Sequence, residues 1–280
     1  MNTETLDQPI VADVAVSAPA VVIESATPAV AAVAEGPNPF IALGLDAALV
    51  RAVSDLGYTQ PTEVQAKVIP LAMGSGKADE ASIDLMVSSQ TGSGKTAAFL
   101  LPVLNTLIAQ KAIEAAAEQA EFERQRAQAA ASGEAAPKRA KRKNPMQSRN
   151  FKAAVPGALV LCPTRELAQQ VAQDAIELVK HCKNLRVANV VGGMPYQLQI
   201  AKLQNADLVV ATPGRLLDLQ RSLQIKLDKV QFLVVDEADR MLDMGFADDL
   251  EEVHQMTAQR KQTMMFSATF APRIQQLAMR

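Results

Sequence analysis

The chain has 280 residues, of which 49% are hydrophobic, and it carries a formal net charge of −2 with two cysteines and no tryptophan. This apolar fraction can fill a buried core, which excludes a wholly disordered chain, and two cysteines without metal-site spacing exclude a disulfide-stapled scaffold. The near-neutral charge argues against a histone-like polycation but is compatible with a local basic groove.

The N-terminal segment lacks the basic start of a secretory signal. No uninterrupted apolar run reaches the roughly 18–20 residues needed to cross a bilayer. We therefore expect a cytoplasmic protein without membrane contact.

Residues 1–36 are rich in alanine, valine and proline and carry five acidic side chains and no basic one. The apolar residues are small and the prolines interrupt any regular pattern, so this segment is predicted to be a disordered acidic tail. The alternative is a short strand or helix that caps the folded core.

From residue 83 onwards, short apolar runs alternate with segments of helical period such as Glu166–Lys180. Strands that alternate with helices predict an α/β domain with a mostly parallel central sheet and helices on both faces, in which ligands bind beyond the carboxyl ends of the strands. The runs are Ile83–Val87, Ala158–Leu161, Val187–Val191, Leu208–Val210, Phe232–Val235 and Thr263–Phe266.

The first run is followed by Ser89-Gln90-Thr91-Gly92-Ser93-Gly94-Lys95-Thr96 and then by a helical segment. The glycines allow a tight turn in which successive N–H groups point at one anion, while Lys95 can reach the terminal phosphates of a nucleotide and Thr96 offers a hydroxyl to Mg²⁺. The strict P-loop pattern has glycine where Ser89 stands, and we expect a small residue to serve at this hinge. The alternative is a glycine-rich turn with an incidental lysine.

Residues 111–150 interrupt the alternation. The first half, up to Ala131, has high helix propensity but little apolar face, and Ser132-Gly133 and Pro137 end it. We predict an exposed helical extension followed by a flexible basic loop, which serves either as a phosphate-binding arm or as a solvated insertion. The basic residues of this loop are Lys138, Arg139, Lys141, Arg142, Lys143 and Arg149.

The fifth run is followed by Asp236-Glu237-Ala238-Asp239. An aspartate at the tip of a buried strand is placed to hold the Mg²⁺ shell, and Glu237 can orient or deprotonate an attacking water. The alternative is a helix start decorated with carboxylates, which the helix dipole favours. The P-loop upstream favours the catalytic interpretation.

Further motifs lie at other strand ends and, for Gly57–Gln65, ahead of the first run, and together with the P-loop and Asp236–Asp239 they resemble those of the DEAD-box ATP-dependent RNA helicases. The resemblance covers residues 38–280 apart from the 111–150 insert, and the segments around Asp236–Phe246 and Met264–Phe270 are similar to the bacterial RhlE-type branch. The further motifs are Gly57–Gln65 with Phe40 upstream, Pro163–Ala168, Gly192-Gly193, Thr212–Arg215 and Ser267-Ala268-Thr269.

The resemblance implies a RecA-like domain over residues 37–280 that binds ATP, Mg²⁺ and the RNA backbone. Phe40 would stack on the adenine, Gln65 would read its edge, and Thr96 and Asp236 would hold Mg²⁺, the latter through water. The residues expected to bind ATP are Phe40, Gln65, Ser89, Gln90, Thr91, Gly92, Ser93, Gly94, Lys95 and Thr96. Those with catalytic roles are Lys95, Asp236, Glu237, Ser267 and Thr269, the last two as a link between the ATP and RNA sites. Those expected to hold RNA by phosphate and 2′-OH contacts are Pro163, Thr164, Arg165, Gly192, Gly193, Thr212, Pro213, Gly214 and Arg215.

Plainer alternatives stand beside these roles: Phe40 as a core aromatic, and Arg165 and Arg215 as members of structural ion pairs. The family also has a second RecA-like domain that supplies an arginine finger, whereas this chain ends at Arg280, so we expect that domain to be absent and activity to be low. The chain is thus predicted to be the ATP-binding half of an ATP-dependent RNA helicase, with a catalytically poor ATP- and RNA-binding module as the alternative. Protein partners, such as those of RNA degradation or ribosome assembly, are left unidentified.

Overall fold

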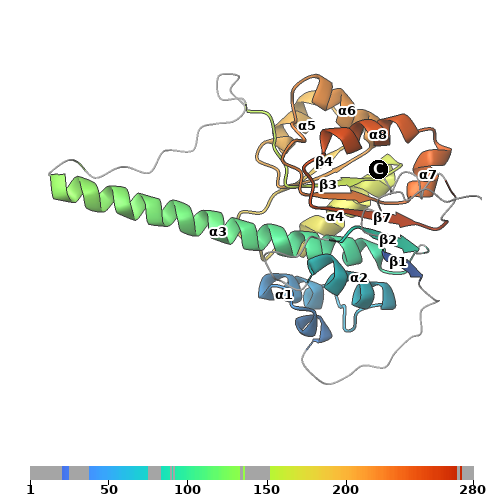
Figure 1. Ribbon diagram of the computed structural model, residues 1–280, viewed down its shortest axis with the longest axis horizontal. Helices are drawn as coiled ribbons and strands as arrows, with labels where there is room; N and C mark the ends of the chain where they lie inside the picture. Colours follow the sequence, from blue (N-terminus) through green and yellow to red (C-terminus); the bar gives the residue numbers. More distant parts are fainter. Residues whose placement is uncertain are drawn as a thin grey trace, which may run out of the picture.

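The computed structural model describes residues 38–74, 83–88, 92–132 and 152–269, the strand Val21–Glu24 and the single positions 90, 135 and 272. Within these residues the chain forms a seven-stranded sheet of order β1-β2-β7-β6-β3-β5-β4, in which every adjacent pair is parallel (Figure 1). The strands are β1 (Val21–Glu24), β2 (Leu85–Ser88), β3 (Ala158–Leu161), β4 (Val187–Val190), β5 (Leu208–Ala211), β6 (Phe232–Val235) and β7 (Gln262–Ser267). The predicted parallel sheet is confirmed, with strand ends shifted by one or two residues.

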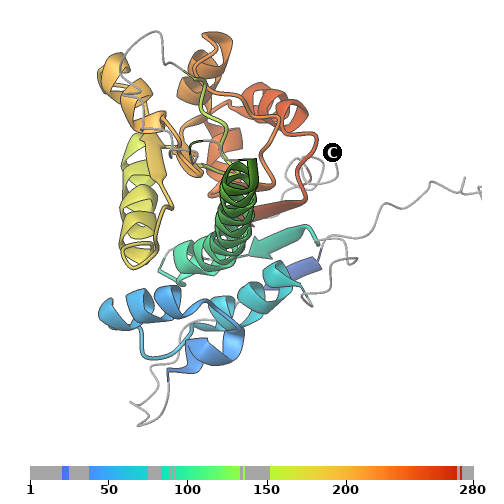
Figure 2. The same cartoon turned by 90° about the vertical axis from the view of Figure 1, so that its left-hand side faces the viewer.

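Helices cover both faces of the sheet, as predicted (Figures 1 and 2). One face carries the short 3₁₀ helix η1 (Pro39–Leu43) with α1 (Ala47–Asp55), α2 (Glu63–Met73), α3 (Lys95–Ser132) and α4 (Arg165–Leu178). The other face carries α5 (Tyr196–Leu203), α6 (Pro213–Arg221), α7 (Ala238–Asp243) and α8 (Ala247–Met256).

The alternation of side chains along each central strand divides the core into two. In β3, Ala158 and Val160 join the cluster under α1–α4, whereas Leu159 and Leu161 join the cluster under α5–α8. Successive residues of a strand point to opposite faces, so a strand buried on both faces must be apolar throughout. This requirement explains the continuous apolar runs in the sequence.

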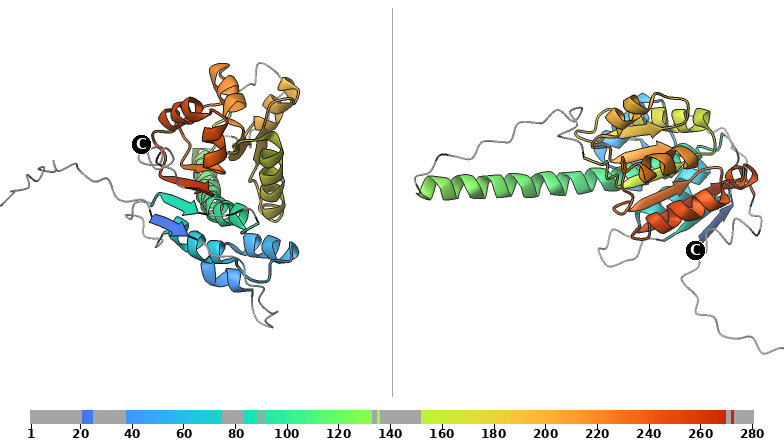
Figure 3. Two further views of the ribbon diagram at one scale, coloured as in Figure 1. Left: turned by 90° about the vertical axis from the view of Figure 1, so that its right-hand side faces the viewer. Right: turned by 90° about the horizontal axis from the view of Figure 1, so that it is seen from above.

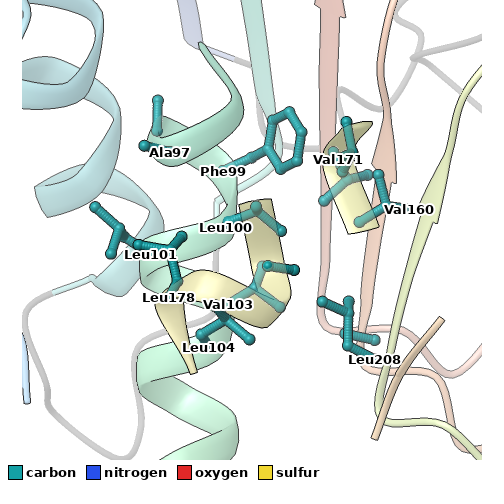
Figure 4. Close-up of a cluster of buried hydrophobic side chains, with 14 of the residues drawn as sticks. Ala97, Phe99, Leu100, Leu101, Val103, Leu104, Val160, Val171, Leu178 and Leu208 are labelled. Carbon is teal, nitrogen blue, oxygen red and sulfur yellow. The ribbon is translucent and has the colours of Figure 1, made fainter. Parts of the chain in front are cut away.

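The start of α3 is the centre of the first cluster (Figure 4). Its residues from Ala97 to Leu104 pack against α4 and the sheet, and the rings of Phe99 and Phe266 meet edge to face with centroids 5.2 Å apart. Truncating a buried phenylalanine of this kind costs about 3–5 kcal/mol. The helix that begins at Lys95 is therefore held rigidly at the end that carries the P-loop.

The same helix continues without a break through Lys111 to Ser132, which confirms the predicted helical extension (Figure 3). Two contacts mark where it leaves the domain: Lys111 Nζ lies 2.9 Å from Asp207 Oδ1, and the side-chain amides of Gln110 and Gln231 hydrogen-bond reciprocally. The hydrogen bond to Asp207 raises the pKa of Lys111, although partial burial opposes the rise. An 18-residue window of α3 is apolar enough to cross a membrane, but half of it is buried inside the domain, which is typical of a core helix.

The tail prediction is wrong for Val21–Glu24, the only residues of the segment 1–36 that the structure describes. They form β1, which pairs in parallel with β2 at the sheet edge, so the alternative of a short capping strand holds here. The edge of β2 offers unpaired backbone groups that a valine-rich segment can satisfy. The rest of the tail and the predicted basic loop lie outside the described residues.

Candidate functional site

Two clefts open at the carboxyl ends of the strands. The first has a volume of about 620 Å³ and lies between the P-loop, the start of α2, the loop that precedes it and one side of α4. The second has a volume of about 420 Å³ and lies between the starts of α4 and α6 and the loop from α7 to α8. Most of the residues predicted to bind ATP or RNA line one of these two clefts.

The described part of the P-loop is a tight turn that leads into α3. Gly92 and Gly94 both have φ near +81°, a conformation that only glycine adopts without strain. A Cβ at Gly94 would lie 2.6 Å from Gln65 Nε2 and 2.9 Å from Thr62 Oγ1, whereas one at Gly92 would meet nothing within 4 Å. Gly94 is therefore required by close packing as well as by its backbone angle. Ser89 and Thr91 lie outside the described residues.

Lys95 brings the P-loop and the Asp236–Asp239 segment together, as the sequence predicted. Its Nζ lies 3.0 Å from Asp236 Oδ1 and 3.4 Å from Glu237 Oε1, although the lysine is separated from them by about 140 positions in the chain. A single ammonium group therefore offsets half of the formal charge of two carboxylates in this arrangement.

Asp236 has no exposed surface, and neither of its carboxylate oxygens accepts a well-aligned hydrogen bond from a described residue. Burial raises the pKa of this carboxyl group, while the nearby Lys95 opposes the rise. The hydroxyl of Ser93 is likewise buried without a partner among the described residues. A carboxylate with vacant lone pairs fits a hard cation such as Mg²⁺, and a hydroxyl donor beside a P-loop fits a phosphate. Thr96 lines the same cleft.

Glu237 adopts a left-handed backbone conformation, with φ 53° and ψ 53°. A non-glycine residue in this region costs about 1–3 kcal/mol and is held there only by its surroundings. Its side chain lies between Lys95 and Arg240, whose Nη1 is 3.2 Å from Glu237 Oε2. The strain aims the carboxylate into the first cleft, where it is part of the lining.

Gln65 fastens the start of α2 to the P-loop. Its Oε1 accepts from the backbone N–H of Thr62, and the Thr62 hydroxyl accepts from the N–H of Gln65, which together form a capping box. The amide nitrogen of Gln65 donates to the carbonyl of Gly94 at 3.1 Å. Gln65 lines the cleft as expected, but in this structure its amide is bonded to the protein.

Phe40 does not lie where the sequence placed it. Its side chain has no exposed surface, belongs to the core cluster under α1–α4 and is not part of the cleft lining. Its N–H donates to the capping side chain of Asn38, so the residue anchors η1 against the domain. The alternative role of core aromatic therefore describes Phe40, and the expectation of base stacking is corrected.

The segment Asp236–Asp239 also reaches the Ser267–Thr269 motif. Asp239 Oδ2 accepts hydrogen bonds from the N–H of Ala268, the N–H of Thr269 and the Thr269 hydroxyl at 3.1–3.3 Å. The Ser267 hydroxyl instead donates to the carbonyl of Thr269 at 2.7 Å. Four consecutive residues thus touch the P-loop lysine at one end and the end of β7 at the other.

The second cleft is built on two helix starts. Thr164 caps α4 by accepting from the N–H of Leu167, and Pro213 occupies the first turn of α6 behind Thr212. Unpaired N–H groups and the positive end of the helix dipole make such starts favourable for phosphate groups. The predicted residues that line this cleft are Pro163, Thr164, Arg165, Gly192, Thr212, Gly214 and Arg215, whereas Pro213 and Gly193 lie just outside the lining.

Arg165 is placed by the glycine doublet. Its Nη1 donates to the carbonyl of Gly192 at 3.2 Å, and a Cβ at Gly193 would lie only 2.0 Å from that nitrogen. Within the described residues its ionic neighbour is Glu166, 4.0 Å away, and because both side chains are largely exposed this ion pair contributes little to stability. Arg215 forms no ion pair with a described residue.

Several lining residues were not predicted. The second cleft also includes Glu166, Asp218, Met244 and Phe246, and the first cleft extends along α4 to Asp174 and its neighbours. Burial raises the pKa of Asp174. Glu166 lies inside the Pro163–Ala168 motif but was given no role there. The other residues do not directly follow a strand, so the rule that located most candidates passes over them.

Comparison with known proteins identifies one family, and the similar proteins reported below carry the names of its members. Residues 62–277 match the DEAD/DEAH box helicase family. The chain is 43% identical over 244 residues to DEAD-box ATP-dependent RNA helicase 52A of Oryza sativa subsp. japonica, and the match covers 85% of this chain and 35% of the relative. It is 39% identical over 231 residues to ATP-dependent RNA helicase SrmB of Escherichia coli K12, covering 82% of this chain and 42% of that protein. The chain thus spans less than half the length of these curated relatives.

Solved structures agree on the fold. A DEAD box protein from Methanococcus jannaschii superposes with a TM-score of 0.61 at 31% identity, covering 85% of this chain and 52% of that one. The yeast DEAD-box splicing factor Prp28 superposes with a TM-score of 0.62 at 28% identity, covering 84% of this chain and 47% of that one. The expected RecA-like helicase fold is therefore confirmed.

Proposed function

Because the chain belongs to the DEAD/DEAH box helicase family, we propose that it binds ATP with Mg²⁺ in the first cleft and RNA in the second, and that it couples ATP hydrolysis to RNA remodelling. The observation that supports the proposal is the chain of contacts that joins the P-loop lysine to the Ser267–Thr269 segment through Asp236–Asp239. Asp236 and Glu237 face Lys95 of the P-loop, and Asp239, two residues further on, holds Thr269.

The first cleft supplies the groups that ATP requires. The P-loop N–H groups, the Ser93 hydroxyl and Lys95 would hold the phosphates, and Asp236 and Thr96 would hold Mg²⁺, which neutralises phosphate charge when bound. Lys95 must then exchange its carboxylate partners for phosphate oxygens. That exchange leaves Glu237, still restrained by Arg240, able to orient a water and accept its proton.

The second cleft supplies what a ribose–phosphate backbone requires. The starts of α4 and α6 offer N–H donors, Arg165 and Arg215 offer positive charge, and Gly192 allows a close approach. None of these groups reads a base edge in the way that a paired side chain does in a DNA groove. Binding is therefore expected to depend little on base sequence.

Hydrolysis by the 280-residue polypeptide is expected to be slow. No arginine is found among the described residues that line the first cleft, and an arginine finger contributes about 10³–10⁵ in rate in P-loop enzymes. The same observation favours the second candidate, a module that binds ATP and RNA with little turnover.

Single-turnover ATP hydrolysis by the purified chain, with and without single-stranded RNA, separates the two candidates. The helicase proposal expects slow hydrolysis that RNA accelerates, whereas the binding module gives none that exceeds the Glu237→Gln control. Binding of an RNA strand and of its DNA counterpart, measured with a non-hydrolysable ATP analogue, tests the substrate class. Equal affinities for the two strands would contradict the RNA assignment.

A further inference from the structure

We propose that Tyr196, at the start of α5, is a positioning residue that holds the Arg215 guanidinium over the second cleft. This inference rests on the proposed role of that cleft in RNA binding. The guanidinium carbon of Arg215 lies 5.9 Å from the centroid of the Tyr196 ring, within the range of a cation–π interaction. No ion pair with a described residue competes for the guanidinium, so the ring is its identified restraint.

The ring can act as a restraint because it is itself fixed at both ends. Its body packs, half-buried, against the core cluster under α5–α8. Its hydroxyl hydrogen-bonds to the hydroxyl of Ser222, which in turn donates to the carbonyl of Asp218 at 2.7 Å. Tyr196 therefore ties the start of α5 to the end of α6, the helix whose first turn carries Arg215.

The loop that leads to Tyr196 is held in place by hydrogen bonds from a buried side chain. The fully buried side-chain amide of Gln199 donates to the carbonyls of Val191 and Met194, at 2.9 and 3.0 Å. Between those two residues lies Gly192, whose carbonyl holds Arg165. One short segment, residues 191–199, thus restrains both arginines of the cleft: Arg165 through a main-chain carbonyl and Arg215 through an aromatic face.

The restraint matters because an arginine side chain loses up to about 2 kcal/mol of rotamer entropy when it is ordered. An arginine already held near its binding position loses less of that entropy when a phosphate arrives, so it binds more tightly. Removing the ring should weaken RNA binding through Arg215 alone and should leave ATP binding unchanged, because Tyr196 does not line the first cleft.

A double-mutant cycle on the 280-residue chain tests this proposal, with a labelled single-stranded RNA titrated at low salt. Tyr196→Leu is expected to weaken RNA binding about two- to fivefold, the size of an exposed cation–π interaction. Tyr196→Phe keeps the ring, and Ser222→Ala removes only the partner of its hydroxyl, so each should change affinity less than Tyr196→Leu. In an Arg215→Ala background, Tyr196→Leu should have no further effect.

The outcomes separate the inference from the proposed function. If Arg215→Ala leaves RNA affinity unchanged, the RNA role of the cleft is wrong. If Arg215→Ala weakens binding but Tyr196→Leu does not, or weakens it equally in both backgrounds, the positioning role is wrong. Far-UV circular dichroism and affinity for an ATP analogue identify a variant that has failed to fold. If Tyr196→Leu fails in this way, Ser222→Ala, which frees the tethered hydroxyl of the ring, is measured in both backgrounds: it should weaken RNA binding only where Arg215 is present, and an equal effect in the Arg215→Ala background would overturn the positioning role.

Discussion

The two clefts lie at the same edge of the sheet but differ in the kind of polar group that lines them. In the first cleft, charged and polar groups are paired with the protein itself: Lys95 forms ion pairs with Asp236 and Glu237, and the Gln65 amide donates to the carbonyl of Gly94. In the second cleft, helix starts and a glycine carbonyl surround two arginines that lack strong ionic partners.

The difference shows how each cleft meets its ligand. The first must break internal ion pairs before phosphate can take their place, so its affinity depends on an exchange of partners. The second keeps positive charge available, so binding there should be immediate, salt-dependent and insensitive to sequence. The predictions below alter one cleft while the other serves as the control.

Lys95→Met is expected to have the largest effect. It removes the charged contact to phosphate, which is worth about 2 kcal/mol or more, so ATP affinity should fall by at least about 30-fold in a calorimetric titration. RNA affinity measured without nucleotide should stay within twofold. The matched control is Lys67→Met on α2, where the lysine pairs with Glu63 at the surface and should be neutral. A loss of less than threefold in ATP affinity would show that Lys95 is not the phosphate-binding lysine.

Gly94→Ala and Gly92→Ala separate packing from backbone strain in the same loop. Both residues have φ of +81°, so both variants should lose roughly 1–3 kcal/mol of unfolding free energy from strain. Only the Cβ at Gly94 meets Gln65 and Thr62, so Gly94→Ala should lose about 1 kcal/mol more in urea unfolding. Equal losses would mean that the contact between Gln65 and the P-loop is loose.

Arg165→Ala tests the second cleft in the same way. Removing one charge-assisted phosphate contact should weaken RNA binding about tenfold and should leave ATP affinity unchanged. The slope of log RNA affinity against log salt concentration should become shallower by about one. Arg51→Ala, an exposed position on α1 that lines neither cleft, is the control. Unchanged RNA affinity in Arg165→Ala would remove the main support for this cleft as an RNA site.

Asp236→Asn tests the cost of the buried carboxylate. The pKa of Asp236 is higher in the folded chain than its ordinary value of 3.8, so the folded state binds the proton more tightly than the unfolded state. This group therefore adds stability as pH falls through its raised pKa, and that stability is lost as pH rises through it. Asparagine should raise the unfolding free energy at neutral pH by about 1 kcal/mol and remove this part of the pH dependence. A variant that is less stable at neutral pH would show that the ion pair with Lys95 outweighs the burial.

The smallest effect is expected outside the two clefts. Deleting residues 138–149, which lie outside the described residues, removes six basic side chains. If they form a phosphate-binding arm, RNA affinity should fall by roughly threefold and its salt dependence should flatten. No change in either would favour a solvated insertion.

The sequence predicted the parallel sheet because strands buried on both faces must be apolar throughout. Most of its candidate site residues line one of the two clefts because ligands bind where such strands end. It could not decide the role of Phe40, since stacking on a base and packing in a core both call for an aromatic residue. Nor could it show the left-handed backbone of Glu237, which depends on its neighbours in space.

Contacts between residues that are distant in the sequence were the hardest features to predict. The side-chain amide of Gln65 has the donor and acceptor needed to hydrogen-bond a base edge. In the structure, however, its partners are Thr62 and Gly94, and Gly94 is 29 positions away. Tyr196 and Arg215 carry no shared motif, and only the packing of α5 beside α6 brings them together. Val21–Glu24 has strand propensity, but acidic and proline-rich surroundings obscured the open edge of β2 that it fills.

Amide hydrogen exchange on the 280-residue chain tests the central claim, that the two clefts bind different ligands, most directly. With ATP and Mg²⁺, slowed exchange is expected in the P-loop and at the start of α3, and little change at the starts of α4 and α6. With single-stranded RNA alone, slowed exchange is expected at Thr164–Glu166, Gly192-Gly193 and the start of α6. Protection by RNA that appears at the P-loop, or that spares the starts of α4 and α6, would contradict the account.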